Sequence, residues 1–468
     1  MARSRLALAL YAVLPALTLV AGIAVAVVAV APFVVPDGRV LFALALAAVA
    51  PILAAAVLGI VTPRYDVVLL GVIGVLVAIG TSSLFGLSLT PGPAGEFYSA
   101  IVTRHALFVA VGFLALVIGS LAERGVDRAR RYPFTLLTAA IALTVATVLF
   151  GVTVNGARLW LGIGSARFQP SEIARLLIAM FVAVFLYERR HLLAAPWSVR
   201  GLDLPPAPYL LPLVGAVIVA VAVLIFQNDL GMAALVVLGA SATVVSVVRS
   251  RAAVGLAALL LGGALVGAYF AVPRVRDRVL GWLDPWLDPA GRGFQFVQAD
   301  FSLSAGNFIG DGRAISAGNV PEVHTDLVLV AVASQFGLPV GLAALALAAV
   351  LVCRCMLAGL RTRDGFRALL VISLAMLIAI QVILIAGGSL RVLPLTGLTF
   401  PLLSYGGTSM IVTQFALGII VGIGARPAAL ARGAQFDGVR ILHGQSAGLP
   451  DRGTADAAIW TGAEGRTT

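Results

Sequence analysis

Long apolar runs separated by short polar segments recur along the whole chain. About twelve of them reach the length of roughly 20 residues with which an α-helix crosses a bilayer. The runs cover residues 6–35, 41–62, 67–87, 106–122, 134–153, 171–187, 209–226, 230–248, 252–272, 327–352, 368–390 and 402–424. The pattern predicts an all-α, polytopic membrane protein with about 12 transmembrane helices. Residues 273–325 form a large extracellular loop in this prediction.

The two ends of the chain can be interpreted from length and charge. The run at 6–35 is longer than the ~7–15-residue apolar core of a cleaved signal peptide, so we expect a retained first helix. Arginines gather in alternate loops, among them 124–131, 189–200 and 361–367. By the positive-inside rule both termini are cytoplasmic. The Gly-, Ala- and Arg-rich segment 425–468 is expected to be a disordered cytoplasmic tail.

Composition narrows the function classes. Of 468 residues, 60% are hydrophobic and 11% are charged, against roughly 25% charged in soluble domains, which excludes a soluble enzyme. The net charge of +11 comes from 32 arginines, because the chain has no lysine. We expect these cations to contact membrane lipids rather than nucleic acid. The sequence contains no phosphate-binding P-loop, which makes an ATP-driven pump a poor interpretation.

A first polar group flanks the run that begins at residue 171. Glu172 and Arg175 share a helix face at i, i+3, which predicts an ion pair at a membrane entry. Together with Gln169, Arg158 and Arg167, they are also candidates for binding an anionic lipid headgroup, since arginine forks match phosphate oxygens.

A second polar group lies in the large loop. Trp286, Asp288, Gln295 and Gln298 combine a flat apolar ring with hydrogen-bonding groups, a combination that suits sugar rings. An amphipathic helix lying on the membrane is the alternative. Asp229, between two runs, is interpreted mainly as a turn residue, with a proton or ion site as the alternative.

The third group directly precedes the run at 327–352. Thr325 or Asp326 is suited to cap that helix. Asp326 also lies where an outer cavity would meet the bilayer, and partial desolvation there would raise its pKa toward that of a useful base. Near the start of the last run, the sequence Ser404-Tyr405-Gly406-Gly407 allows close approach of backbone or ligand.

The order of these motifs resembles the SEDS family of bacterial envelope proteins (FtsW, RodA and SpoVE). NGAxxW, FQPSE, DLG, DP…G.G.Q..Q, PExHTD and LPxTGLTxPxxSYGG follow one another over Tyr65–Gly424. The resemblance implies a ten-helix core at 65–424, preceded by two extra helices in 1–64 and followed by the tail at 425–468. This arrangement is most similar to the actinobacterial RodA type.

The resemblance also implies an activity. SEDS proteins polymerise lipid II, an undecaprenyl-diphosphate-linked disaccharide peptide, into peptidoglycan at the outer face of the bacterial cytoplasmic membrane. They serve elongation or division and work with a class B penicillin-binding protein. The family's essential acid falls on Asp326, with Glu322, His324 and Thr325 as shapers of the site. Arg158, Arg167 and Arg175 are expected to bind the diphosphate, and Ser404, Gly406 and Gly407 to bind substrate.

Three points stay open from the sequence. No cofactor and no metal ligand is assigned, and a divalent cation (Mg²⁺ or Mn²⁺) at the diphosphate is left as an alternative. Arg175 stands where the family usually has lysine, and Leu159, Ser334 and Gln335 also depart from its pattern. A lipid II flippase and a noncatalytic scaffold that activates a penicillin-binding protein are the competing functions.

Overall fold

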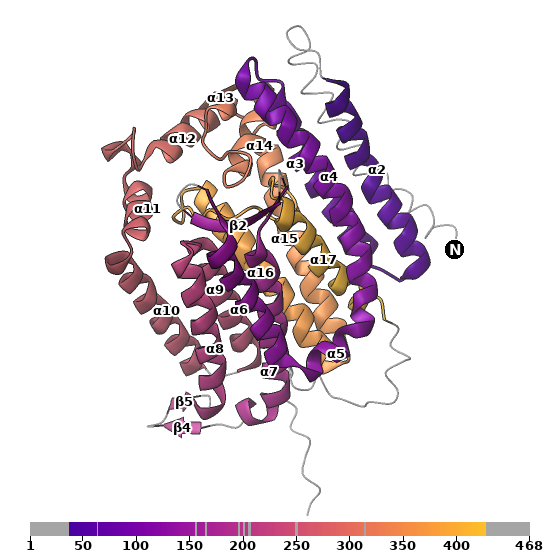
Figure 1. The fold of residues 1–468 in the computed structure, drawn as a ribbon, viewed down its shortest axis with the longest axis vertical. Helices are drawn as coiled ribbons and strands as arrows, with labels where there is room; N and C mark the ends of the chain where they lie inside the picture. Colours follow the sequence, from indigo (N-terminus) through magenta and orange to yellow (C-terminus); the bar gives the residue numbers. More distant parts are fainter. Residues whose placement is uncertain are drawn as a thin grey trace, which may run out of the picture.

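The computed structural model describes residues 37–426, apart from 63, 155–156, 164–165, 195–196, 200–201, 205–206, 249–250 and 313–314. This part of the chain is a bundle of long helices with short strands in hairpins at its two ends (Figure 1). The α-helices are α2 (Gly38–Val61), α3 (Val67–Ser88), α4 (Pro93–Ala122), α5 (Val126–Arg131), α6 (Pro133–Phe150), α7 (Pro170–Ala194), α8 (Ala207–Phe226), α9 (Leu230–Val247), α10 (Arg251–Ala271), α11 (Pro273–Leu283), α12 (Phe294–Gly306), α13 (Ile315–Gly318), α14 (Val328–Phe336), α15 (Leu338–Arg361), α16 (Gly365–Ser389) and α17 (Gly407–Gly424). The 3-10 helices are η1 (Glu123–Gly125) and η2 (Pro285–Leu287), and the strands are β1 (Val152–Val154), β2 (Ala157–Ile163), β3 (Ala166–Phe168), β4 (Trp197–Val199) and β5 (Leu202–Leu204).

The expected polytopic, all-α architecture is confirmed. Within the described residues, ten helices are long and apolar enough to cross a bilayer. The expected span at 252–272 is the helix α10, although several of its side chains are outside the description. The expected span at 6–35 and nearly all of the expected tail also lie outside the described residues.

Two predicted spans are wrong in their boundaries. The run at 106–122 belongs to α4, which begins at Pro93. The single helix expected over 327–352 is divided into α14 and α15 by Gly337, whose φ is 89°. Residues with a side chain rarely adopt this left-handed backbone conformation, and Pro339 suits the first turn of the helix that follows. Asp326 therefore does not cap a long membrane helix. The cap residue of α14 is Leu327, which makes no side-chain capping bond.

Glycines bring α4 and α17 into close contact. A β-carbon on Gly119 would collide with the carbonyl oxygen of Phe415, and one on Gly418 with that of Leu116. Small residues at such crossings let helix backbones approach each other inside a membrane, where packing replaces the hydrophobic effect as the driving force. The close approach of α4 and α17 therefore depends on these glycines.

The large loop expected at 273–325 is folded rather than irregular. It contains α11, η2, α12 and α13, which arch over one end of the bundle (Figure 1). The three-stranded sheet β1–β2–β3 lies at the same end, with Val152 opposite Trp160 and Leu161 opposite Phe168. We call this the loop end, and the opposite end, which carries η1 and α5, the α5 end.

Candidate active site

The segment Pro321–Asp326 forms a tight turn at the loop end. The backbone N–H groups of Thr325 and Asp326 both donate to the carbonyl oxygen of Glu322, at 3.1 and 3.0 Å. Glu322 has a φ of 52°, a backbone angle that residues other than glycine rarely adopt. The Thr325 hydroxyl donates to the Glu322 carboxylate at 3.3 Å. These bonds fix the direction in which the next residue, Asp326, projects.

A second loop holds this turn from outside. The Ser404 hydroxyl donates to the Thr325 carbonyl oxygen at 2.5 Å and accepts from the Phe400 N–H at 2.8 Å. The Tyr405 N–H donates to the His324 carbonyl oxygen at 2.8 Å. Ser404 thus positions the turn Pro321–Asp326 through hydrogen bonds to backbone groups.

Aromatic side chains pack around His324. Its ring meets the rings of Phe97 and Tyr98 edge-on, with centroids 5.9 Å apart in both pairs, and that of Tyr405 at 5.9 Å. Burial lowers the pKa of His324, and the charge of nearby Glu322 opposes this effect. A neutral imidazole at neutral pH follows, so His324 acts here as a packing group that joins the turn to α4.

The Asp326 carboxyl faces an arginine across a narrow gap. A β-carbon built on Gly397, whose φ is 74°, would lie 3.3 Å from Arg278 Nη2 and 3.8 Å from Asp326 Oδ2. Burial, and secondarily the charge of Glu322, raise the pKa of Asp326 to about 7; the Thr325 hydrogen bond and the Arg278 charge act in the opposite direction. At neutral pH this carboxyl can therefore both accept and release a proton.

Arg278 reaches this gap from α11. Its Nη1 donates to the Thr396 carbonyl oxygen at 2.9 Å, which leaves Nη2 beside Gly397. Burial lowers the pKa of Arg278, while the charges of Asp326 and Asp229 oppose this lowering. The sequence interpretation missed Arg278, because nothing in the local pattern distinguishes it from Arg274 and Arg276 on the same short helix.

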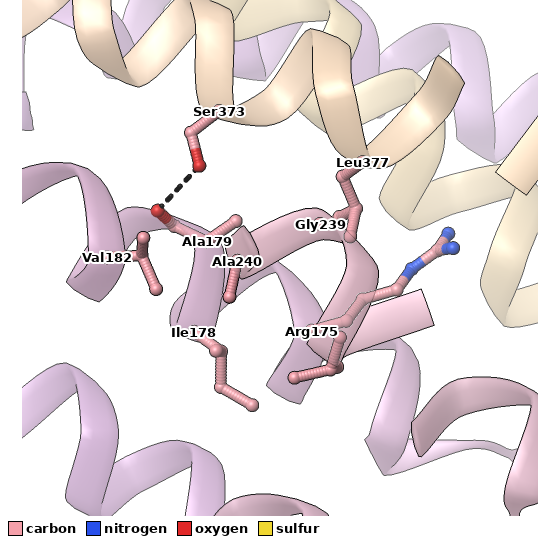
Figure 2. A pocket seen from close by; sticks show the side chains of 9 residues that line it. Arg175, Ile178, Ala179, Val182, Gly239, Ala240, Ser373 and Leu377 are labelled. Atoms are coloured by element: carbon pink, nitrogen blue, oxygen red, sulfur yellow. Dashed lines mark hydrogen bonds between the residues drawn. The ribbon is translucent and has the colours of Figure 1, made fainter. Parts of the chain in front are cut away.

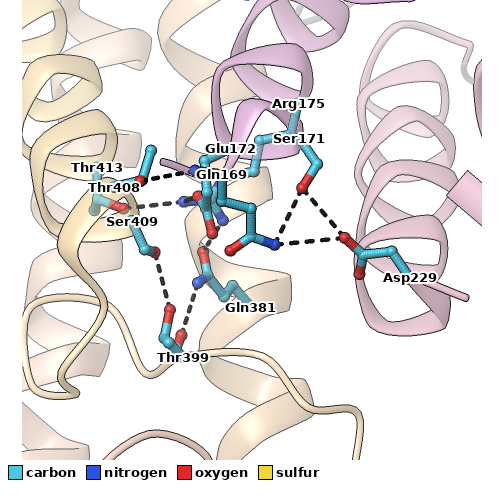
Figure 3. A network of polar contacts seen from close by, with 10 residues as sticks. All are labelled: Gln169, Ser171, Glu172, Arg175, Asp229, Gln381, Thr399, Thr408, Ser409 and Thr413. Atoms are coloured by element: carbon cyan, nitrogen blue, oxygen red, sulfur yellow. Dashed lines mark hydrogen bonds and ion pairs between the residues drawn. The ribbon is translucent and has the colours of Figure 1, made fainter. Parts of the chain in front are cut away.

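Beneath the gap, a polar network crosses the bundle (Figure 3). Arg175 pairs with Glu172 at 2.6 Å, and both side chains are buried. Its guanidinium also donates to Gln381 Oε1 at 2.5 Å and to the Thr413 hydroxyl at 3.1 Å. The predicted ion pair is confirmed, and the guanidinium of Arg175 contacts three side chains in the bundle.

The network continues to the start of α9. The Asp229 carboxylate caps α9 by accepting from the Met232 N–H at 3.1 Å, and it also accepts from the Ser171 hydroxyl at 3.2 Å. The Gln169 side chain lies between Ser171 and Asp229, and its backbone N–H donates to the Thr408 hydroxyl at 3.0 Å. The predicted turn role of Asp229 is confirmed.

A small cavity lies beside Arg175, between α7, α9 and α16 (Figure 2). It has a volume of about 10 Å³ and is lined by Arg175, Ile178, Gly239, Ser373 and Leu377, among others. This is about the space that a single water molecule needs. The network is thus closely packed on this side.

The other predicted diphosphate ligands lie elsewhere. Arg158 on β2 and Arg167 on β3 are exposed at the loop end, whereas Arg175 is buried in the bundle. The Arg158 side chain donates to the Thr153 hydroxyl at 3.3 Å and to the Val148 carbonyl at 3.4 Å. The structure therefore places these three arginines in two different environments.

The predicted sugar ligands of the large loop are mostly tied into its own fold. Asp288 accepts from the Arg292 N–H at 3.1 Å and thereby closes the turn after η2. Trp286 is 54% exposed and meets the ring of Phe301 edge-on. Gln295 donates to the Pro321 carbonyl oxygen at 3.1 Å, and this bond connects α12 to the turn that carries Asp326.

Three further predicted residues have clear positions. Gln298 is half-buried on α12. Gly406 precedes α17, and Gly407 begins it, where a β-carbon would strike the ring of Phe108. Close packing explains both glycines. In the described part of the chain, no three His, Cys, Asp or Glu side chains are grouped so that they could hold a metal ion.

The fold and the site define a multi-pass membrane protein with a titratable carboxyl and a facing guanidinium at one end of a helical bundle. The sequence profile of the family described as cell cycle protein, FtsW/RodA/SpoVE, matches residues 62–427. The chain belongs to this family. The predicted membership of the SEDS family, of RodA type, is confirmed.

Individual relatives agree with this assignment. The peptidoglycan glycosyltransferase RodA of Mycobacterium tuberculosis is 33% identical over 375 residues, which cover 78% of this chain and 79% of that protein. The probable peptidoglycan glycosyltransferase FtsW of Tolumonas auensis is 31% identical, covering 77% and 92%. A solved peptidoglycan synthase complex that coordinates polymerization and crosslinking contains a chain with a TM-score of 0.62 and 27% identity, covering 77% of this chain and 97% of that one. Thermus thermophilus RodA shares the fold at a TM-score of 0.54 and 23% identity, covering 77% and 96%.

Proposed function

We propose that this protein is a peptidoglycan glycosyltransferase that polymerises lipid II at the outer face of the cytoplasmic membrane. The observation that carries the proposal is the Asp326 carboxyl, whose pKa is raised to about 7, opposite Arg278. A carboxyl with such a pKa suits general base catalysis at neutral pH. The names of the relatives, which are peptidoglycan glycosyltransferases, support the reaction class.

The reaction is an inverting glycosyl transfer. Asp326 accepts the proton of the acceptor sugar's hydroxyl as its oxygen attacks the anomeric carbon of the donor. The bond from that carbon to the diphosphate oxygen breaks, and the polyprenyl diphosphate leaves with the electron pair. Arg278, whose Nη2 lies beside the gap, offers a positive charge where negative charge develops. Diphosphate is already a good leaving group, so positioning and charge supply most of the catalysis.

The loop end faces the outside of the cell in this proposal. The α5 end carries Arg124, Arg128, Arg130 and Arg131 within nine residues, and such clusters remain on the cytoplasmic side. Asp326 then lies at the outer face of the cytoplasmic membrane, where the lipid-linked disaccharide is presented. The chain termini are cytoplasmic in this orientation.

A crosslinking partner follows from the same activity. The solved complex to which this chain is similar coordinates polymerization and crosslinking. Crosslinking of peptidoglycan is a transpeptidation, and we infer a class B penicillin-binding protein as the partner.

The network beneath the site favours an enzyme over a flippase. A flippase requires a polar path that opens across the bundle. Here Arg175 is bonded to Glu172, Gln381 and Thr413, and the adjoining cavity holds about 10 Å³. The hypothesis of a noncatalytic scaffold was based on Ser334 and Gln335. Both residues are buried on α14, where the Ser334 hydroxyl donates to the Ala331 carbonyl oxygen. Packing on α14 thus accounts for Ser334, whereas the amide nitrogen and oxygen of Gln335 are buried without a hydrogen-bond partner among the described atoms.

The decisive experiment compares wild type with Asp326→Asn. Purified protein with its partner and lipid II should produce glycan polymer, and Asp326→Asn should reduce the rate by at least about a hundredfold, which is within the range for general base catalysis. Asp277→Asn removes an exposed carboxylate from the same end of the molecule and should leave the rate unchanged. Equal polymer from wild type and Asp326→Asn would refute the assigned base. Lipid II movement across vesicles without polymer would favour the flippase.

A further inference from the structure

A cavity of about 650 Å³ lies at the loop end between α2, α3 and α4. Its volume is within the usual range of small-molecule sites. One wall belongs to α2, which packs along α4 at the edge of the bundle (Figure 1) and precedes the region that the family profile matches. One wall of the cavity therefore lies outside the region that the family profile matches.

Charges of both signs line the cavity. Arg39 from α2 and Arg104 from α4 supply two guanidinium groups, and Asp37 and Glu96 supply two carboxylates. Within the described part of the chain, no ion pair involves any of these four side chains. The hydroxyl of Thr90 also lines the cavity and has no hydrogen-bond partner among the described atoms. A ligand that carries both a negative and a positive group would satisfy this lining.

Exposed apolar side chains follow the two arginines one helical turn further along α2 and α4. Phe42 follows Arg39 at i+3 and is 73% exposed, and Leu107 follows Arg104 at i+3 and is 56% exposed. Residues three apart lie on the same helix face. Each arginine is thus paired with an apolar side chain toward the bilayer interior, where acyl chains would lie.

We propose that this cavity binds the headgroup of a zwitterionic phospholipid, an amine-bearing phosphodiester whose acyl chains lie along α2 and α4. The phosphate would accept from Arg39 and Arg104, since guanidinium forks match phosphate oxygens. The ammonium would pair with Glu96 and Asp37. A purely anionic lipid would leave these carboxylates opposed to its charge.

Occupancy of the cavity has a route to the active turn. Glu96, in the first turn of α4, lines the cavity, and the next two residues, Phe97 and Tyr98, meet the ring of His324. His324 belongs to the turn that carries Asp326. A bound headgroup would hold the start of α4 and thereby this turn. This second step rests on the proposed glycosyltransferase function, whereas lipid binding does not.

The binding test uses the full chain in nanodiscs that contain equal amounts of phosphatidylethanolamine and phosphatidylglycerol. Native mass spectrometry should show about tenfold preferential retention of phosphatidylethanolamine. The double variant Arg39→Gln/Arg104→Gln should lose this preference, whereas Arg361→Gln, an exposed arginine at the α5 end, should keep it. Equal retention of the two lipids by wild type, or an unchanged preference in the double variant, would overturn the site. Displacement by an equal concentration of glycerophosphoethanolamine would overturn the assignment to a membrane lipid.

The coupling test measures polymerisation by the same proteins in the two pure lipids. Wild type should be several-fold faster in phosphatidylethanolamine, and the double variant should show no lipid dependence. Lost lipid preference with unchanged polymerisation would refute the coupling and leave the lipid site intact. Absence of polymer from wild type in both lipids, with retention intact, would refute the glycosyltransferase proposal instead.

Discussion

The pH dependence of polymerisation tests the site most directly. Asp326 must be ionised to accept a proton, and its pKa is raised from 3.8 to about 7. The rate should therefore rise with pH through about 7. At pH 6 only about one tenth of the molecules would hold the active carboxylate, and at pH 8 about nine tenths. An unperturbed aspartate would give a flat profile over this range.

Two substitutions should move this profile in opposite directions. Glu322 raises the pKa of Asp326, so Glu322→Gln should move the rise to lower pH. Arg278 lowers the pKa of Asp326, so Arg278→Gln should move the rise to higher pH. A single charge close to a buried carboxyl changes its pKa by about one unit or more. Arg278→Gln should also lower the plateau at high pH, because the leaving diphosphate loses a cation.

The assay is the initial rate of glycan polymer formation from lipid II, measured from about pH 5.5 to pH 9 at constant ionic strength. Arg361→Gln changes the net charge equally at the distant α5 end and serves as the control for Arg278→Gln. A rate that does not change with pH in wild type would refute Asp326 as the base. The same conclusion would follow if Glu322→Gln and Arg278→Gln moved the profile in the same direction, because opposite charges cannot act alike on one carboxyl.

Two further predictions concern the groups around the base. Gly397→Ala should reduce polymerisation at least tenfold in folded protein, because its methyl group would enter the gap between Arg278 and Asp326 at a φ of 74°; a rate within twofold of wild type would contradict the gap's role. Arg175→Met should destabilise the protein by about 3–5 kcal/mol by leaving Glu172 buried and unpaired, and adding Glu172→Gln should recover much of the loss. Thermal unfolding in detergent measures the stability of Arg175→Met and of the double variant Arg175→Met/Glu172→Gln. A double variant no more stable than Arg175→Met would contradict the pairing.

Most of the helices could be predicted from the sequence, because a run of about 20 apolar residues has few alternatives in a membrane. The division between α14 and α15 could not. The break at Gly337 depends on a long-range contact, since a β-carbon there would strike the backbone of Phe308 and Ile309. A hydropathy pattern contains no information on such contacts between distant segments.

The candidate site was only partly predictable for a related reason. Asp326 could be identified because a carboxyl beside an apolar run is costly to bury, and the ion pair of Glu172 with Arg175 followed from helical spacing. Arg278 could not be identified, because its role depends on the loop that presents the Thr396 carbonyl and Gly397 to α11. The diphosphate role of Arg175 was expected from residue type and from its place near a membrane interface with two other arginines, whereas in the fold this side chain is bonded inside the bundle.

Comparison of two acidic residues near Arg278 indicates which one is suited to catalysis. Asp229 accepts hydrogen bonds from the Met232 N–H and the Ser171 hydroxyl, so its oxygens already have partners and it caps a helix. Burial and the charge of Glu322 oppose the ionisation of Asp326, and the neighbouring Thr325 side chain and Arg278 offset this only in part. A carboxyl is reactive as a base when its charge is incompletely stabilised before the reaction. The same guanidinium thus lies near one acid fixed for structure and another whose ionisation is left open to chemistry.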